Sequence, residues 1–472
     1  MQKRTIRGLA CLLWAAHGAA QANDLLDAYQ QAQAQDTVLQ AALYQRGAAI
    51  EARPQALAAF FPQLDANANL ARDKISSADA GSSSLSIPGS SAGPVSSLGP
   101  VAGNTAIYAL TLNQQIWSFQ SFHKLMEADL QVAQAEASYR DAQQSLILRV
   151  ATAYFNVLAA DDTLRTNQLE RDAYGELLRQ ARKRLDDGLS PQTDVKEAQS
   201  FYDVTAASVI DAESALDDAR RALAELTARD TQTLAPLKDE IPLAPPDPAQ
   251  AEDWVQTALQ DNFALHAADL QAQAAQRDIS ANRAKGLPTL VLRGSVNKAE
   301  YSSEFGDNER DDHINLVVDW PLFQGGTVAS LVRQAKNTYQ QLHAVYEGQR
   351  RSVEHQTHNA YRGVVSGIEK IRSGHQAVAS NLAAVDADRA GLELGTRTEF
   401  SPLQAQTNYY DTLRSYYQSR YDYLTSSLTL KQLAGRLSEA DLGAVDEFLV
   451  SAAAPSAVSG GLSADTSADS AK

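Results

Sequence analysis

The stretch RLDDGLSPQTDVKEAQ at residues 184–199 returns in altered form as GLELGTRTEFSPLQAQ at residues 391–406. Laying Gly188 over Gly395, a shift of 207 residues, aligns the two segments from end to end. Glycine tolerates the positive φ that a chain needs where one helix turns back onto the next. The pattern therefore predicts two similar helical hairpins within one chain.

The residues after each glycine can cap the helix that follows. Thr193 is suited to the N-cap position after the first turn, and Thr398 or Ser401 has the corresponding place after the second. Pro402 would then take the first helical position, where a missing N–H is tolerated. From these residues alone, both stretches are interpreted as capped turns.

The repeat extends over most of the chain, which has 472 residues. Three further matches are Tyr154 with Tyr361 at a shift of 207, Leu110–Trp117 with Leu316–Phe323 at 206, and Phe61–Leu64 with Leu287–Leu290 at 226. The change from 226 to 207 places additional residues of the first copy in the Gly/Ser/Pro-rich stretch Ser76–Asn104. We expect that stretch to be a loop.

Each copy has the order helix, strand, loop, strand, very long helix, turn, helix. Alternation of apolar and polar residues predicts the strands near residues 62–75, 105–118, 288–300 and 312–323. Their length is close to the ~9–11 residues with which a tilted strand crosses a bilayer. Stretches almost free of proline predict the long helices at 119–186, 191–228, 326–392 and 398–436.

The first copy occupies residues 23–230 and the second 251–436. The segment 231–250 between them is rich in proline and is predicted to be a linker, and residues 437–472 end in a disordered tail. At ~1.5 Å per residue, each of the two longest helices would extend roughly 100 Å. A compact globular domain has no use for helices of this length.

Residues 1–22 have the basic start, short apolar core and A-x-A cleavage site of a secretory signal, so the mature protein is expected to begin at Asn23. The only cysteine, Cys11, lies in that signal, which excludes disulfides and thiolate chemistry in the mature chain. The formal net charge of −16 argues against nucleic acid as a partner.

Aromatic residues gather where the predicted strands meet the helices, and a second, smaller group lies toward the loops. Two such groups are typical of the interfacial belts of an outer-membrane barrel. The alternative is an ordinary soluble hairpin with one buried face. The first group is Phe60, Phe61, Trp117, Phe119, Trp320 and Phe323, and the second is Tyr301 and Phe305.

Four strands cannot close a membrane barrel, for which about eight strands are needed in known single-chain barrels. An open sheet edge is not tolerated in lipid, because its N–H and C=O groups would lack partners. Several chains must therefore contribute to one barrel. The strand count alone leaves open whether two or three chains do so.

An enzyme and a periplasmic adaptor or scaffold are the two alternative classes of protein. The segment EHQTH places Glu354, His355 and His358 on a helix, but no third ligand or general base accompanies the two histidines, and we interpret it as a solvated helix face. The sequence thus predicts no enzyme, no metal site and no cofactor. A periplasmic coiled-coil adaptor or scaffold would explain the long helices, but it would not explain two pairs of strands with aromatic ends.

The chain resembles the TolC family of bacterial outer-membrane channel proteins. The motifs that carry this resemblance are FPQL, LILRVATAYFNVLAA, GLSPQTDV, FALHAADLQAQ, LPTL, WPLFQGG and GTRT. They span the mature chain apart from loops and tail. The resemblance implies a mixed α and β fold in a homotrimer, with a shared twelve-stranded outer-membrane barrel, four strands per protomer, continuous with a long periplasmic tunnel of helices. It also places the linker in a belt around that tunnel.

The resemblance further implies a gate at the hairpin tips. By position, Arg397 and Thr193 match one polar link that holds such tunnels closed, and Asp194 matches half of another, whose tyrosine partner is replaced by Leu392 here. Two acidic positions at the entrance fall on Ser401 and Gln404, which implies weaker cation selectivity unless Glu399 substitutes. The turns that would contact a periplasmic adaptor contain Gly188, Leu189, Gly395 and Thr396.

The function that the resemblance implies is that of an outer-membrane exit duct in a Gram-negative bacterium. It would receive cargo from an inner-membrane ABC exporter through the periplasmic adaptor. Similarity to the type I secretion branch favours a repeat-toxin polypeptide, such as a haemolysin or a cyclolysin, as cargo. The main alternative is a multidrug efflux pump, and the cargo is not written in this sequence.

Overall fold

The computed structural model describes residues 24–75, 101–229, 233–301, 307–398 and 400–450. The predicted signal, Phe305, Glu399 and the tail from residue 451 lie outside the described residues. The chain divides into two compact units, and each unit takes residues from both sequence copies. One unit (residues 1–40, 143–258 and 355–472, here the hairpin unit) contains the helical hairpins, and the other (41–142 and 259–354, the sheet unit) contains the strands. The spatial units therefore cut across the repeat.

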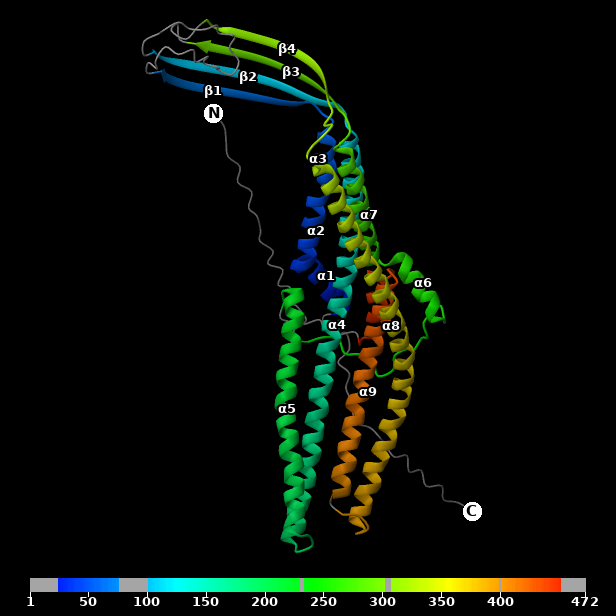
Figure 1. Cartoon of the computed structure of the whole chain (residues 1–472). Coiled ribbons are helices and arrows are strands. Elements are labelled where there is room, and N and C mark those ends of the chain that lie inside the picture. The colour runs from blue at the N-terminus through cyan, green and yellow to red at the C-terminus, as the bar shows by residue number, and fades with distance from the viewer. Residues whose placement is uncertain (1–23, 76–100, 230–232, 302–306, 399, 451–472) are drawn as a thin grey trace, which may run out of the picture. The chain divides into compact units, whose positions relative to one another are not determined.

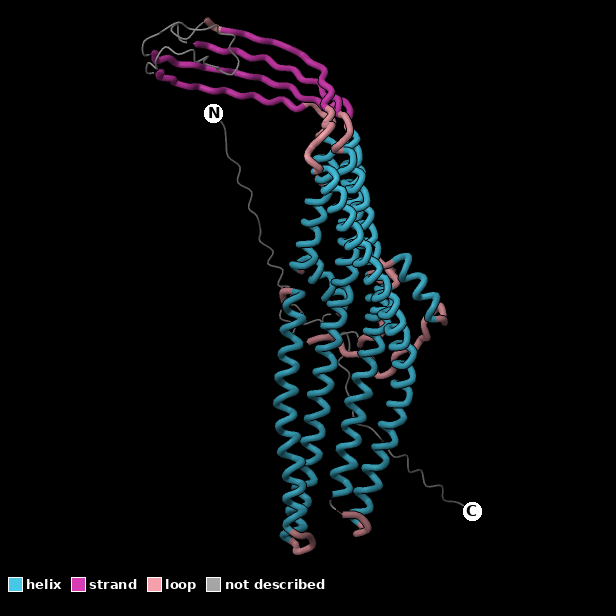
Figure 2. The backbone as a smooth tube through the Cα atoms, viewed as in Figure 1, coloured by secondary structure: helices cyan, strands magenta, loops and turns pink. Residues whose placement is uncertain are grey.

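The sheet unit contains one antiparallel sheet with the strand order β1-β2-β3-β4 (Figure 2). Its strands are β1 (Gln63–Ile75), β2 (Val101–Trp117), β3 (Thr289–Tyr301) and β4 (Glu309–Asp319). β4 ends at Asp319, before the Trp320 that the alternation pattern had included. Pro321 explains this boundary, because proline has no N–H to continue a ladder.

β2 begins earlier than the sequence pattern indicated. Gly103 and Asn104 were predicted to lie in a loop, but their backbones pair with Asp73 and Arg72 of β1. Pairing with a neighbouring strand has overridden a weak local preference here.

The two faces of the sheet differ in polarity. Cross-strand pairs on one face are Leu64 with Leu112, Leu110 with Val296, and Leu292 with Leu316. The opposite face carries Asn67, Asn113, Arg293 and Asn315, as expected from the period-two alternation of strands. Leu316 keeps 64% of its surface exposed within the chain, so the apolar face has no cover in a single subunit.

Aromatic side chains lie beside the ends of the strands that join the helices. The rings of Trp117 and Phe119 meet edge to face, with their centroids 5.4 Å apart. Phe61, Trp320 and Phe323 are exposed. Large exposed aromatic residues in such a row are typical of the level of lipid headgroups.

Four long helices follow the strands and pair as hairpins (Figure 1). They are α4 (Phe119–Asp186), α5 (Gln192–Thr227), α8 (Thr327–Glu393) and α9 (Phe400–Leu433). The shorter helices are α1 (Leu25–Gln35), α2 (Thr37–Ile50), α3 (Ala52–Ala58), α6 (Ala251–Asp261), α7 (Phe263–Ala284) and α10 (Glu439–Asp446). None of the helices in the described ranges combines the length and apolar character needed to span a lipid bilayer.

The glycines of α8 do not interrupt it, although glycine has a low helix propensity. Gly363, Gly367 and Gly374 face α9, where an added Cβ would lie 2.9 Å from Ser426 Oγ, 3.2 Å from Tyr423 Cβ and 3.3 Å from Tyr416 Cδ2. Because these distances are shorter than ordinary van der Waals contact, the glycines allow the two helices to approach closely. Packing between helices compensates for their low helix propensity.

The linker and the C-terminal segment pack within the hairpin unit. Leu237 of the linker forms a β-bridge with Leu449, and the Tyr154 hydroxyl donates a hydrogen bond of 3.0 Å to the carbonyl of Ala235. The carboxylate of Asp446 accepts hydrogen bonds from the N–H groups of Leu25 and Leu26, which begin α1. The start and the end of the described chain are thereby joined.

Candidate functional site

The two hairpin tips have the same backbone geometry. Gly188 and Gly395 both have a φ of 71°. The N–H of Leu189 donates to the carbonyl of Arg184, and the N–H of Thr396 donates to that of Gly391, at 2.7 and 2.9 Å. Each glycine N–H bonds one turn earlier, to the carbonyl of Leu185 or Leu392. This is the Schellman pattern, and it occurs twice at the shift of 207 found in the sequence.

The capping roles predicted for Thr193 and Ser401 are wrong, and the alternative role of Thr398 is not tested, because Glu399 lies outside the described residues. Pro191, in extended conformation, is the residue before α5, so Thr193 lies inside the first turn of the helix. The second helix of the other hairpin begins at Phe400, which places Ser401 and Pro402 inside it as well. Proline is tolerated there because the first four N–H groups of a helix have no partner within it.

A glycine-to-alanine exchange tests the geometry of the tips. We expect Gly395→Ala to lower the free energy of unfolding by ~1–2 kcal/mol, because alanine disfavours the left-handed region. Gly348→Ala in α8 is the matched control, since its added Cβ meets nothing within 4 Å; it should raise that free energy by ~0.5–1 kcal/mol. Urea unfolding followed by circular dichroism measures both, and equal effects would contradict a positive φ at Gly395.

The predicted gate residues lie near the two tips. Thr193 is exposed and Asp194 half-buried, with the Thr193 hydroxyl 3.2 Å from the Asp194 carboxylate. Ser401 is half-buried, and the exposed Gln404 donates a hydrogen bond to Asn408. The predicted role of Glu399 falls outside the described residues.

Arg397 forms an ion pair within its own chain. Its Nε lies 3.4 Å from the Asp388 carboxylate, and 59% of its side chain is exposed. The stem of the same side chain covers Gly391, where an added Cβ would lie 2.6 Å from Arg397 Cγ. A link from Arg397 to Thr193 therefore remains a prediction for the assembled protein.

One contact joins the two hairpins close to their tips. Arg184 of α4 donates a hydrogen bond of 3.3 Å to the carbonyl of Leu392 in α8. Leu392 is itself buried. This contact could not be predicted from the sequence, because a backbone carbonyl accepts a hydrogen bond from any donor.

A buried polar network joins α4 to α9 further from the tips. Arg414 of α9 donates hydrogen bonds to Glu170 at 2.6 Å and to Asn167 at 2.8 Å, and it also pairs with Asp411. The Tyr174 hydroxyl lies 2.8 Å from Thr407 Oγ1. The side chain of Glu170 is only 7% exposed. A charge buried to this extent is costly unless an opposite charge compensates it, and Arg414 supplies that opposite charge.

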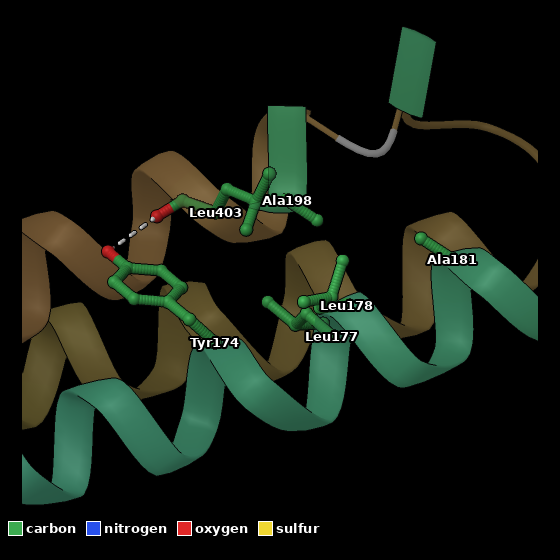
Figure 3. Packing of buried hydrophobic residues seen from close by; sticks show 6 residues of the cluster. All are labelled: Tyr174, Leu177, Leu178, Ala181, Ala198 and Leu403. Carbon is green, nitrogen blue, oxygen red and sulfur yellow. Dashed lines mark hydrogen bonds between the residues drawn. The ribbon is translucent and has the colours of Figure 1, made fainter. Parts of the chain in front are cut away.

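Apolar packing continues this network toward the tips. Leu403 of α9 lies against Tyr174, Leu177 and Leu178 of α4 and Ala198 of α5, and Figure 3 shows the hydrogen bond from Tyr174 to the Leu403 carbonyl. We call this cluster together with the network the α4–α9 seam. It holds the second hairpin against the first within one subunit.

Burial and neighbouring charges shift the pKa values of side chains in and beside the α4–α9 seam. Desolvation would lower the pKa of Arg414, but its hydrogen bonds to Glu170 and Asp411 outweigh it and raise that pKa. Desolvation, together with nearby carboxylates, raises the pKa of Tyr174 above its usual range and that of Tyr410 to about 12. The tyrosines therefore remain neutral donors, and the guanidinium of Arg414 stays charged at neutral pH.

Two leucines at the tips lack a hydrophobic environment. Leu189 is 76% exposed and Leu394 is 79% exposed, one at each tip. Neither polarity nor backbone geometry requires leucine at these positions. The two leucines are not equivalent in the repeat, because the shift of 207 relates Leu189 to Thr396 and Leu394 to Asp187.

The histidine cluster of the sequence lies in α8, where His355 is exposed and His358 is half-buried. His355 lies 3.2 Å from the side chain of Asn359 on the same helix. Among the described residues, no group of three or more His, Cys, Asp or Glu side chains could hold a metal ion.

The chain belongs to the outer membrane efflux protein family. The family's sequence model matches residues 28–229 and 254–436, which together cover most of the chain. Members of this family are outer-membrane channels of tripartite export systems, and they are transporters rather than enzymes. The chain is therefore an outer-membrane channel of a Gram-negative bacterium with a periplasmic helical portion, and the adaptor or scaffold alternative is wrong.

Individual relatives agree with this assignment. The chain is 33% identical to the outer membrane protein TolC of Vibrio cholerae over 430 residues, which cover 89% of this chain and 92% of TolC. It is 28% identical to the proteases secretion protein PrtF of Dickeya chrysanthemi, over 92% of this chain and 93% of PrtF. The structure of the outer membrane protein VceC from Vibrio cholerae has the same fold, with a TM-score of 0.73 at 18% identity over 87% of this chain and 96% of VceC.

Proposed function

We propose that three copies of this chain form one exit duct for polypeptides. In this proposal the sheets pool into a shared barrel in the outer membrane, and the hairpins form a periplasmic tunnel. A periplasmic adaptor binds the hairpin tips and connects them to an inner-membrane ABC exporter. The cargo is a secreted polypeptide of the repeat-toxin kind.

The observation that carries the assembly is the sheet of a single subunit. It has an exposed apolar face, and its outer strands β1 and β4 each have one edge without a partner in the described chain. Lipid tolerates the apolar face but not the open edges. Identical neighbours can supply the missing hydrogen bonds on both edges, which favours a closed ring of subunits.

The hairpin tips support the adaptor. Leu189 and Leu394 would each contribute about 1.5–3 kcal/mol if they became fully buried against a partner. With one leucine per tip and two tips per subunit, a ring of subunits would offer a repeated set of small apolar sites. Weak contacts repeated around a ring suit a partner that binds with avidity.

Similarity supports the polypeptide cargo. A relative named for the secretion of proteases matches this chain over nearly the full length of both proteins. The family description, by contrast, names efflux, so drug export is the second candidate. The duct recognises little by itself, because specificity resides in the pump and the adaptor.

Deletion of the gene in its own bacterium tests the cargo. We expect a repeat-containing polypeptide to disappear from the culture medium and to accumulate in the cells, with inhibitory concentrations of antibiotics unchanged. Mass spectrometry of the medium and growth assays measure the two outcomes, and the wild-type gene restored on a plasmid is the control. An unchanged set of secreted proteins with increased drug sensitivity would contradict polypeptide export and favour efflux.

A further inference from the structure

The two free strand edges contain information about how neighbouring subunits pair. Within the described chain, β1 has a partner only on its β2 side and β4 only on its β3 side. The internal repeat relates β1 to β3 by a shift of 226 and β2 to β4 by a shift of 206. Both shifts were found in the sequence, so the structure can test them.

The two hairpins of the sheet follow these shifts. Leu64 pairs with Leu112 in the first hairpin. Moving Leu64 forward by 226 gives Leu290, and moving Leu112 forward by 206 gives Val318; those two residues are paired in the second hairpin. The same holds for every other pair of the second hairpin, because both ladders are regular. The repeat is therefore a reliable guide to backbone pairing in this sheet.

The same operation on the central pairing, β2 with β3, produces a pairing that one chain cannot make. Adding 206 to the residue numbers of β2 gives β4, and subtracting 226 from those of β3 gives β1. β4 and β1 lie at opposite edges of the same sheet. Thr111 pairs with Ser295, and the shifts convert this pair into Val317 and Asn69. Likewise Ala109 with Asn297 becomes Asn315 with Ala71, and Leu110 with Val296 becomes Leu316 with Leu70.

We infer that β4 of one subunit pairs antiparallel with β1 of the next copy of this chain, with Val317 opposite Asn69 and Asn315 opposite Ala71. This inference rests on the proposed assembly, and it adds the register of the interface between subunits. Within one chain, β2 pairs with β3. The equivalent pairing of β4 with β1 needs a second copy of the chain, because β1 and β4 lie at opposite edges of one sheet.

The polarity of the faces agrees with this register. Leu316 and Leu70 both lie on the apolar face and would be direct neighbours across the interface, joining the pair of Leu292 with Leu316 to the pair of Leu70 with Ala106. A slip of one residue would place Leu316 opposite Asn69 and reverse one subunit's faces relative to the next. Continuity of the lipid-facing surface therefore excludes odd slips.

Engineered disulfides distinguish this register from slips of two residues. Directly opposed residues in antiparallel strands have Cα atoms ~4.5–5.5 Å apart, within the range that a disulfide bridges, whereas diagonal neighbours lie ~7–8 Å apart. Because the only native cysteine is Cys11 in the predicted signal, the introduced thiols would be the only ones in the mature chain. The paired positions lie on opposite edges of a four-stranded sheet, and three strand spacings of ~4.8 Å separate them by at least about 14 Å, so a disulfide must join two chains.

The experiment uses four positions in two combinations. Asn315→Cys with Ala71→Cys, and Val317→Cys with Asn69→Cys, should give covalent dimers and trimers on non-reducing denaturing gels after mild oxidation. The exchanged combinations, Asn315→Cys with Asn69→Cys and Val317→Cys with Ala71→Cys, contain the same substitutions and serve as controls. We expect at least about tenfold more cross-linked product in the first two variants than in the controls.

Native mass measurement of each variant in detergent separates the possible failures. Stronger cross-linking of the exchanged combinations, or none in any variant of a stable trimer, would overturn the register while the proposed assembly stands. A monomer in the unmodified protein would overturn the assembly itself.

Discussion

Replacement of Arg414 by methionine is expected to lower the free energy of unfolding by about 3–5 kcal/mol, because it leaves the charge of Glu170 buried without a partner. Methionine keeps much of the volume and the apolar stem of arginine, so lost packing contributes little. The hydrogen bond to Asn167 is lost in the same variant. Urea unfolding of the purified protein, followed by circular dichroism, measures the change.

Two control variants separate charge burial from other causes. Glu170→Gln combined with Arg414→Met removes both charges and should recover most of the loss. Arg372→Met removes an exposed ion pair with Glu369, in which both side chains are more than half exposed, and should change the stability by less than about 1 kcal/mol. If Arg414→Met behaves like Arg372→Met, the α4–α9 seam does not depend on its buried charge.

The seam also shows what the sequence could not reveal. Glu170 and Arg414 are 244 residues apart, and each looks like an ordinary charged residue on a solvated helix face. The internal repeat does not help, because it relates each residue to an equivalent one and not to a contact. Only the tertiary arrangement brings the two charges together and buries the carboxylate.

Elements that depend on local chemistry were predictable. The positive φ of Gly188 and Gly395 follows from glycine at a helical turn, and the repeat shifts relate the pairing of β1 with β2 to the pairing of β3 with β4. The helix caps were less predictable from the sequence. Thr193 is a good N-cap residue, but Pro191, two residues earlier, already provides the extended backbone at which the helix begins. Where several nearby residues suit one role, the sequence alone does not choose among them.

Arg397→Ser is expected to raise the single-channel conductance of the assembled protein in planar bilayers. If Arg397 links to Thr193 in the closed channel, each lost charge-assisted hydrogen bond of about 1.5 kcal/mol increases the open population roughly tenfold. Stability should change little, because 59% of the Arg397 side chain is exposed, and ion pairs of exposed side chains contribute little.

Asp388→Asn is the matched control, since it removes the ion pair within the chain but leaves the guanidinium of Arg397 free to reach Thr193. Conductance should then remain at the wild-type value, or fall if Arg397, released from Asp388, holds the gate more firmly. An equal increase in both variants would mean that the pair with Asp388 keeps the tip closed, and no change in either would remove Arg397 from the gate. Comparing the two variants therefore shows which contact of Arg397 keeps the channel closed: the ion pair with Asp388 within one hairpin or the link to Thr193 of the other hairpin. The position of Arg397 at the tip does not distinguish these two contacts.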